Sequence, residues 1–448
     1  MMISSFTFRT SLLLLLVIGS AGFIGSCKNP TAPREPNKFA SQATFIRQLD
    51  SIRVNNSTIL LSGGVARNAL SLPSGDLLFV GEVQRPGSLF RSALVIRTNA
   101  LGVVRWANLY TDSIETLRSI VPMSNGEFIV SGSVFSGNNQ TSGYMLRIDS
   151  LGNTRFSRSY RDSINSTRFF GAVLQDNDRV LFYGQSVQRN RAIADGCVYS
   201  VSIDGNLISS RVFSSLGSRL RINRADIGFT SGIDFGQRAI LGGFYTPIAR
   251  GEGIPTTLLA TDTYIIRLEE NGDTTQFIYD YLSIGGDVSF LTSLQAKLNT
   301  TDEALSFAPS RINPNIFYTF ARTNSIFYIM ELNKDPFNFV RNIIIPENNT
   351  ATLSQFATTL DGNFIFVGTS TQKITFDGLR SPAPGGTDVY IAKYSSQGNL
   401  LWEITQGTSL GDEGLTIKQT IDDGYIITGT SSDKPLLLKV DERGLLAE

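Results

Sequence analysis

Two short stretches, Gly126-Glu-Phe-Ile-Val-Ser-Gly132 and Tyr144-Met-Leu-Arg-Ile-Asp149, decide the fold of this chain. Their β-branched and aromatic residues are typical of half-buried strands. The glycines and polar residues around them supply the positive φ angles that tight hairpin turns require. Gly152 and Phe156 follow the second stretch, so a further strand is expected after a turn. The segment therefore predicts consecutive antiparallel strands joined by hairpins.

The same pattern recurs seven times along the chain. The first stretch closes, in successive copies, at Gly81, Gly132, Gly184, Gly242, Ala321, Gly368 and Gly429, with a mean spacing of about 58 residues. Repeats of this length made only of strands are typical of β-propeller blades. With one strand before and one after the quoted pair, each copy supplies four strands. The sequence thus predicts an all-β, seven-bladed β-propeller of four-stranded blades.

Two recurring residue types have a predicted packing role. The glycine that closes the first stretch should let a neighbouring backbone approach closely, or mark a β-bulge. A large aromatic residue lies four positions after the turn glycine in three copies, as Trp106, Phe156 and Trp402. We expect this aromatic residue to pack between adjacent sheets.

The two ends of the chain suggest how the ring of blades closes. The last copy stops after Asp441-Glu-Arg-Gly444-Leu-Leu and lacks its fourth strand, and an open ring would leave exposed sheet edges. The N-terminal stretch Thr58–Gly63 resembles the missing strand and is predicted to complete the last blade. The stretch Phe45–Asp50 resembles a third strand, and either adds an outer strand or means that the count is off by one.

Residues 1–26 have the features of a secretory signal peptide, with Arg9 followed by the apolar run Ser11–Ile18. The stretch ends in Ile24-Gly-Ser-Cys27, which resembles the lipobox of bacterial lipoproteins; the alternative is an ordinary signal peptide with a chance cysteine. The resemblance implies that Cys27 is lipidated and attaches the protein to a membrane. Lys28 follows the cysteine, which by resemblance to enterobacterial sorting signals implies the outer membrane, with the side of that membrane left open.

The rest of the chain divides into two parts. Residues 27–43 are rich in proline and polar residues and are expected to form a flexible tether. Residues 44–448 are expected to form the propeller.

Composition excludes several classes of function. Lys+Arg and Asp+Glu both number 39, so the net charge is zero and nothing indicates nucleic-acid binding. The chain has no histidine, which removes serine–histidine catalysis and histidine-ligated metals. We therefore predict no cofactor, no metal site and no catalytic residue. Cys197 is expected to be a small buried apolar residue, with a reactive thiol as the alternative.

The loops predict where a binding site lies. In a propeller, the loops between strands two and three and those between blades emerge on one face, and the short glycine turns on the other. Length variation is concentrated in the first group, with the longest loops at residues 246–262 and 371–388. Loops on a rigid scaffold often carry function. The candidate binding face is therefore Tyr245, Arg250, Phe376, Asp377, Arg380 and Asp388; the alternative is that these loops are tolerated insertions.

The carboxylates give little further guidance. Asp149, Asp204, Glu269 and Asp441 recur at one kind of turn, so they are predicted to cap turns rather than to bind calcium. The pairs Asp412-Glu413 and Asp422-Asp423 are interpreted as solvated loop charges.

Taken together, the motifs Gly-Tyr/Phe-Ile-Ile/Val-x-Gly, Tyr-Ile-x-Arg/Lys-Leu-Asp and Gly-Asn-x-x-Trp resemble the blade repeats of secreted and lipid-anchored bacterial propellers. The likeness covers about residues 45–446. It implies the fold and does not imply a reaction, since one fold supports many functions.

The favoured hypothesis is a non-enzymatic envelope protein that binds a protein or glycan partner through its loop-rich face, or scaffolds a complex. The alternative is a carbohydrate-active hydrolase or lyase that uses carboxylates on that face. A third hypothesis is a structural subunit of a secretion or surface assembly. Two carboxylates about 5–10 Å apart in a walled pocket, one with a raised pKa, would favour the enzyme.

Overall fold

The computed structural model describes residues 43–54, 57–111, 113–137, 140–161, 165–175, 178–188, 194–213, 225–235, 238–247, 262–268, 274–279, 306–323, 326–346 and 350–446. Within these ranges the regular structure is β-strand, apart from one short 3-10 helix at Pro384–Gly386, and there is no α-helix. The predicted all-β class is confirmed.

The first part of the chain folds into antiparallel sheets whose strands follow one another in sequence order. A single residue pair, Arg91 with Ile114, links the first two of these sheets. The strands are β4 (Gly63–Ser71), β5 (Leu77–Gln84), β6 (Arg91–Thr98) and β7 (Val104–Leu109); β8 (Ile114–Pro122), β9 (Phe128–Phe135), β10 (Thr141–Ile148) and β11 (Thr154–Tyr160); and β12 (Asn165–Gln175), β13 (Arg179–Gln188), β14 (Ala194–Ser202) and β15 (Leu207–Phe213).

The second part continues in the same way, with one extra hairpin inserted between β25 and β28. The strands are β16 (Ala225–Phe235), β17 (Arg238–Pro247), β18 (Asp262–Leu268) and β19 (Thr274–Tyr279); β20 (Ser306–Pro309), β21 (Ile316–Thr323), β22 (Ile326–Asn333) and β23 (Asn338–Ile345); β24 (Ala351–Thr358), β25 (Phe364–Ser370), β28 (Asp388–Tyr394) and β29 (Leu400–Gln406); the hairpin β26 (Gln372–Ile374) and β27 (Arg380–Pro382); and β30 (Asp412–Gln419), β31 (Tyr425–Ser431) and β32 (Lys434–Val440).

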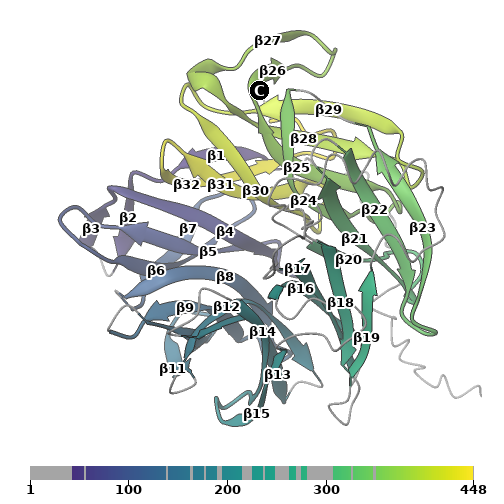
Figure 1. The fold of residues 1–448 in the computed structure, drawn as a ribbon. Coiled ribbons are helices and arrows are strands. Elements are labelled where there is room, and N and C mark those ends of the chain that lie inside the picture. Colours follow the sequence, from purple (N-terminus) through teal and green to yellow (C-terminus); the bar gives the residue numbers. More distant parts are fainter. Residues whose placement is uncertain are drawn as a thin grey trace, which may run out of the picture.

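The last sheet takes its outermost strand from the N-terminal end of the chain. Strand β1 (Phe45–Gln48) pairs antiparallel with β32, with Phe45 opposite Lys439 and Gln48 opposite Leu436. The stretch that resembles a third strand therefore forms a fourth strand. Figure 1 shows β1, in purple, beside the yellow β32 and β31.

The prediction that Thr58–Gly63 completes the last blade is wrong. Strand β3 (Ser57–Leu60) pairs with β2 (Ser51–Val54) in a separate two-stranded sheet, and Gly63 already begins β4. The physical reason is packing: Phe45 lies against the next sheet and is partly buried, whereas the Leu60 side chain is 64% exposed. What distinguishes β1 is that Phe45 lies over Gly102 of the next sheet, whereas Ile59 of β3 packs on the same apolar cluster while its strand pairs with β2.

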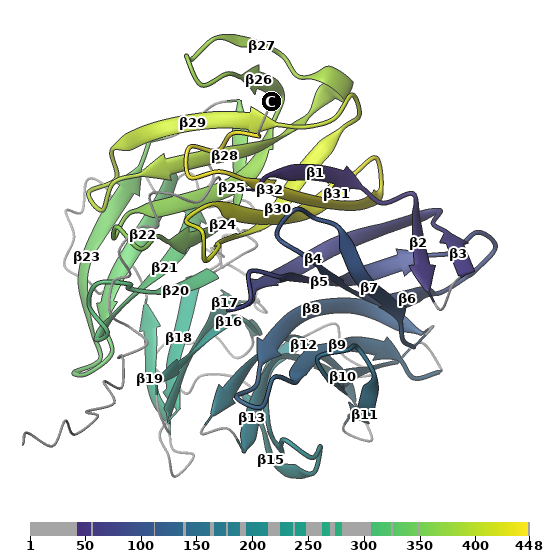
Figure 2. The same cartoon turned by 180° about the vertical axis from the view of Figure 1, so that it is seen from behind.

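Figures 1 and 2 show the sheets arranged around a common centre, which is the β-propeller arrangement. Successive sheets share buried apolar clusters; one example joins Val95 of β6 to Val130 of β9. The first and last sheets share a cluster as well, in which Phe79 of β5 packs with Ile426 of β31 and Leu437 of β32. The hydrophobic core therefore lies between the sheets, where inner strands such as β5 and β9 bury both of their faces.

The recurring glycines allow the close backbone approach, and mark the β-bulges, that the sequence predicts. Each lies opposite a β-bulge in the innermost strand of its sheet, as at Gly81, where the register shifts between Ala66 and Asn68. A Cβ atom added to the glycine would lie 1.7–2.1 Å from a carbonyl oxygen of that strand at Gly81, Gly132, Gly184, Gly368 and Gly429. No other residue fits at that distance.

The aromatic residues of the fourth strands pack on the glycine turn of the next sheet. Trp106 covers Gly152, Phe156 covers Gly205 and Trp402 covers Gly444, each within 2.9 Å of where a Cβ atom of the glycine would lie. This confirms the predicted packing between adjacent sheets. Phe45 of β1 covers Gly102 in the same way. The last sheet therefore packs on the first sheet through the same kind of aromatic–glycine contact.

Candidate functional site

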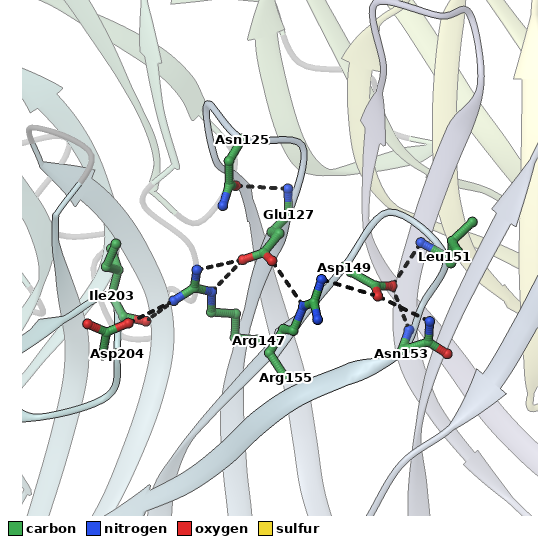
Figure 3. Close-up of polar contacts among 9 residues, drawn as sticks. All are labelled: Asn125, Glu127, Arg147, Asp149, Leu151, Asn153, Arg155, Ile203 and Asp204. Carbon is green, nitrogen blue, oxygen red and sulfur yellow. Dashed lines mark hydrogen bonds and ion pairs between the residues drawn. The ribbon is translucent and has the colours of Figure 1, made fainter.

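The charged residues near the glycine turns are used to join neighbouring sheets. Arg147 of β10 donates to Glu127 (Nε to Oε2, 2.6 Å), and in the next sheet its Nη1 donates to the Ile203 carbonyl (2.9 Å) and to Asp204 Oδ1 (3.1 Å). Arg155 of β11 donates to the other oxygen of Glu127 at 3.0 Å (Figure 3). Burial acts to raise the pKa of Glu127, but hydrogen bonds from Arg147 and Asn125 outweigh it and lower that pKa.

This clamp recurs between other sheets. Arg97 pairs with Asp76 and donates to the Ser150 carbonyl of the next sheet at 2.8 Å. Within the last sheet, Lys439 pairs with Asp422 (2.6 Å), so the interpretation of Asp422 as a solvated charge is wrong; the Lys439 Nζ also donates to the Ala43 carbonyl beside β1. The Arg/Lys position of the repeat is therefore a structural residue. The sequence carries a signal for this role, because a basic residue on the third strand recurs with an acidic residue at the preceding turn.

The turn-capping prediction holds for two of its four carboxylates. Asp149 Oδ1 accepts the backbone N–H groups of Leu151 and Asn153, each at 2.9 Å, and Asp441 makes the equivalent pair of bonds. For Asp204 the prediction is wrong: Ser202 caps that turn, and Asp204 pairs with Arg147. Glu269 lies outside the described residues.

The face on which the second strand of each sheet ends and the third begins is called the loop face. The opposite face, which carries the glycine turns, is called the turn face. On the loop face, the structure brings together three of the six predicted residues. Phe376, Asp377 and Arg380 belong to the hairpin of β26 and β27. Tyr245 lies on β17 opposite Asp262, and Arg250 lies outside the described residues.

Arg380 fastens this hairpin to the sheet beneath it. Its guanidinium forms a close ion pair with Glu403, which also accepts a hydrogen bond from the Tyr390 hydroxyl (2.7 Å). The Ile374 N–H donates to the Thr405 hydroxyl at 2.8 Å. Phe376 at the tip is 52% exposed. The hairpin is therefore a well-anchored loop that presents an aromatic side chain.

Asp388, the sixth predicted residue, is buried beside a second carboxylate. It begins β28 and is only 3% exposed, and Asp412, which begins β30, is 0% exposed. A Cβ atom on Gly407 would lie 2.3 Å from Asp388 Oδ1 and 2.8 Å from Asp412 Oδ2, so these two oxygens are no more than about 5 Å apart. Burial, and then the charge of Asp412, raise the pKa of Asp388 to about 6.

The interpretation of Asp412 as a solvated charge is wrong. Its Oδ2 accepts the backbone N–H of Thr408, and the Thr408 hydroxyl donates to the same carboxylate at 3.1 Å. The aspartate therefore holds the connection between β29 and β30 in place. A solvated side chain could not do this.

A cleft of about 580 Å³ opens on the loop face where the first and last sheets meet. Sequence reasoning missed it, because its two walls come from opposite ends of the chain. One wall belongs to β4, β5 and β6, and the other to β30, β31 and the turn that follows β31. Its lining is Ser62, Gly63, Gly64, Val65, Arg67, Gln84, Arg91, Glu413, Leu415, Thr430 and Asp433.

A buried glutamate organises the basic wall of this cleft. Glu82 is fully buried and its Oε1 pairs with Arg67 Nη2 at 2.8 Å and, more loosely, with Arg91 Nη1 at 3.5 Å. Its Oε2 accepts the Leu117 N–H of the next sheet. The two arginines face a wall that contains Glu413 and Asp433. The cleft thus offers both charge signs and several amide and hydroxyl groups, which suits a polar, hydrogen-bonding ligand.

Exposed apolar side chains lie next to the cleft on the same face. The loop between β5 and β6 carries Leu89, which is 91% exposed, and Phe90, directly before the cleft residue Arg91. The Phe90 ring contacts Phe135 at the end of β9, with the ring centroids 6.0 Å apart. We call Leu89, Phe90 and Phe135 the aromatic patch. Exposed aromatic groups beside a polar cleft are typical of binding surfaces.

Cys197 is fully buried, and burial raises the pKa of its thiol, which agrees with the apolar role rather than the reactive one. No group of three or more His, Cys, Asp or Glu side chains in the described ranges is placed to hold a metal. Among the same residues, no helix is both long and apolar enough to span a bilayer.

Comparison with known proteins finds solved structures that are distantly similar to this chain. No family model and no curated protein matches the chain. Among solved structures, it is similar to the β-propeller domain of the Trilobed protease from Pyrococcus furiosus (9% identity, 87% of this chain and 99% of that one, TM-score 0.45). It is also similar to the Dos1 propeller (12% identity, 90% of this chain and 97% of that one, TM-score 0.45). A third similar structure is the Pyrococcus horikoshii acylaminoacyl peptidase (10% identity, 85% of this chain and 51% of that one, TM-score 0.45). The chain spans about half the length of that peptidase.

Proposed function

We propose that this chain is a lipid-anchored cell-envelope β-propeller that binds a protein or glycan partner through its loop face, or scaffolds an envelope complex. The observation that carries the proposal is the cleft between the first and last sheets, with the aromatic patch at its rim. Charged residues of the turn face, by contrast, are used in clamps between sheets. The loop face therefore combines a polar cleft with exposed aromatic groups, as recognition needs.

The proposal includes a closed ring of seven four-stranded blades. Support comes from the pairing of β1 with β32, from the packing of Phe45 on Gly102 and from the apolar cluster shared by the first and last sheets. Closure would also create the cleft, since its two walls meet only when the ends of the chain are joined.

The direction of β1 supports an outward-facing cleft. Because β1 runs antiparallel to β32, Ala43 lies beside Lys439, at the turn face. A tether formed by residues 27–43 and attached through lipidated Cys27 would therefore leave from the face opposite the cleft. With an outer-membrane anchor, the cleft and the aromatic patch would point away from the bilayer.

The hydrolase or lyase hypothesis has one feature in its favour, the short distance between Asp388 and Asp412 with the raised pKa of Asp388. Both side chains are nonetheless buried, so a polysaccharide chain could not reach them in this conformation. The binding hypothesis needs no such rearrangement, and we prefer it.

Site-specific photo-crosslinking in the anchored protein tests the proposal. We expect a crosslinking residue at Phe90 to capture a partner in intact bacteria, and Arg91→Ala to reduce that capture severalfold. A crosslinker at Leu151, an exposed apolar residue of the turn face, is the matched control. A protein adduct or a glycan adduct at position 90 would identify the partner class. Equal capture at both positions, or capture at position 151 alone, would contradict the proposal.

A further inference from the structure

Of the paired carboxylates of Asp388 and Asp412, the Asp412 carboxylate is hydrogen-bonded by Thr408, whereas one oxygen of Asp388 lacks a partner. Asp388 Oδ1 is buried, and no donor among the described residues bonds to it. No described lysine or arginine forms an ion pair with either carboxylate. Lys373 favours the ionised form of Asp388 only by its charge. A buried carboxylate oxygen without a donor is costly unless a proton or a cation occupies the position next to it.

The space beside that oxygen is preserved by a glycine. Gly407 lies between the two carboxylates, and any side chain at this position would collide with Asp388 Oδ1 and Asp412 Oδ2. The two oxygens therefore converge on one side-chain-free position. The convergence of these two oxygens is a second observation, separate from the burial of Asp388 and Asp412.

The surrounding groups are hydroxyls. The Thr408 hydroxyl lies 3.1 Å from Asp412 Oδ2 and 3.3 Å from the Ser431 hydroxyl. Oxygen donors without nitrogen or sulfur are the set that hard divalent cations prefer. Calcium accepts irregular arrangements of such ligands, whereas magnesium requires near-octahedral geometry.

We propose that Asp388 and Asp412 bind one calcium ion, with the Thr408 hydroxyl as a further oxygen ligand. The ion would neutralise both carboxylates and connect the sheet of β28 to the sheet of β30. A backbone bond already joins these sheets here, from Asp412 N–H to the Thr387 carbonyl at 2.8 Å. This inference goes beyond the proposed binding function and does not depend on it.

Calorimetric titration of the full-length protein with CaCl2, after treatment with a chelator, tests the site directly. We expect one binding event for the native chain and a rise in Tm of about 2 °C at a calcium concentration roughly ten times Kd. In Asp388→Asn both effects should be lost, since the amide matches the shape of the carboxylate and removes the charge. Asp377→Asn, at an exposed carboxylate of the same face, should behave like the native chain.

Two outcomes would overturn the calcium site. One is a Tm that does not respond to CaCl2 but falls between pH 4.5 and 7.5, which would mean that the pair holds a proton instead. The other is a calcium response that persists in Asp388→Asn. Should Asp412→Asn fail to fold because Thr408 loses its acceptor, the Asp388→Asn variant still decides the question.

Discussion

At the scale of single residues, the structure depends on a few positions where only one chemical group fits. The recurring glycines are the clearest case, because carbonyl oxygens of the bulged innermost strands occupy the space of a Cβ atom. The sequence could predict this role, since the glycine recurs at one place in every copy but one. It named Asp388 as a candidate but could not predict that this residue lies beside Asp412, because the two are 24 positions apart and show no ligand spacing.

A substitution at one of these glycines should be severe. In Gly368→Ala, a Cβ atom would lie 1.7 Å from the Thr352 carbonyl oxygen, so one strand must move. We expect a loss of about 2–4 kcal/mol in the free energy of unfolding, measured by chemical denaturation. Gly63→Ala is the control, because the nearest atom to its Cβ would be 3.5 Å away. Equal losses in both variants would show that backbone entropy, not the close approach, explains the glycine.

The buried Asp388 should make stability depend on pH. Its pKa in the folded protein is about 6, above the ordinary value of an unfolded aspartate. The unfolded state therefore loses its proton first, and stability falls as the pH rises from about 4 to 6. In calcium-free buffer, Asp388→Asn should remove this fall and be more stable than the native chain by about 1–2 kcal/mol at pH 7. Thermal unfolding at pH 4.5 and 7.5 measures the difference, and identical pH slopes for the two proteins would refute the assignment.

At the scale of elements, local patterns identify strands well and their partners poorly. Strands recur with the same turns and glycines, so the four-strand unit could be predicted. The choice between Phe45–Gln48 and Thr58–Gly63 as the partner of β32 could not, because both are short apolar stretches near the N-terminus. What decides it is the contact of Phe45 with Gly102, which exists only in the assembled molecule.

Removal of β1 should destabilise the protein more than removal of the adjacent hairpin. Deleting residues 45–50 leaves the outer edge of β32 unpaired and removes Phe45 from its contact, at an expected cost of about 3–6 kcal/mol and with visible aggregation. The control replaces residues 51–60 by a short glycine–serine turn. That turn can close because the Leu61 N–H already donates to the Asp50 carbonyl (2.9 Å). Light scattering and chemical denaturation compare the two, and equal stability would contradict the role of β1.

At the scale of the whole molecule, the cleft shows why sequence reasoning found a face but not its site. Its walls are contributed by residues 62–91 and 413–433, which no local pattern connects. The loop-length argument selected the face on which this cleft opens, and that this face binds a partner stays a prediction. The predicted residues Phe376, Asp377 and Arg380 lie on another loop of that face.

The proposed membrane anchor is tested on the intact protein. We expect the native chain to sediment with membranes and Cys27→Ala to move almost entirely to the soluble fraction, because the acyl chains are lost. Cys197→Ala is the matched control, since Cys197 is buried and should leave sedimentation unchanged. Metabolic labelling with a fatty acid gives a second readout. Cys27→Ala protein that stays with the membranes would show that another element holds it there.

The pairing of β1 with β32 also determines when the molecule can finish folding. Phe45 and Lys439 are about 390 residues apart, so the first strand leaves the ribosome long before its partner exists. During synthesis, the N-terminal strand must wait unpaired while the intervening sheets emerge. Contacts between such distant residues form slowly, and unpaired edges attract other chains. The arrival of β32 therefore ends the period in which the N-terminal strand is open to pairing with other chains.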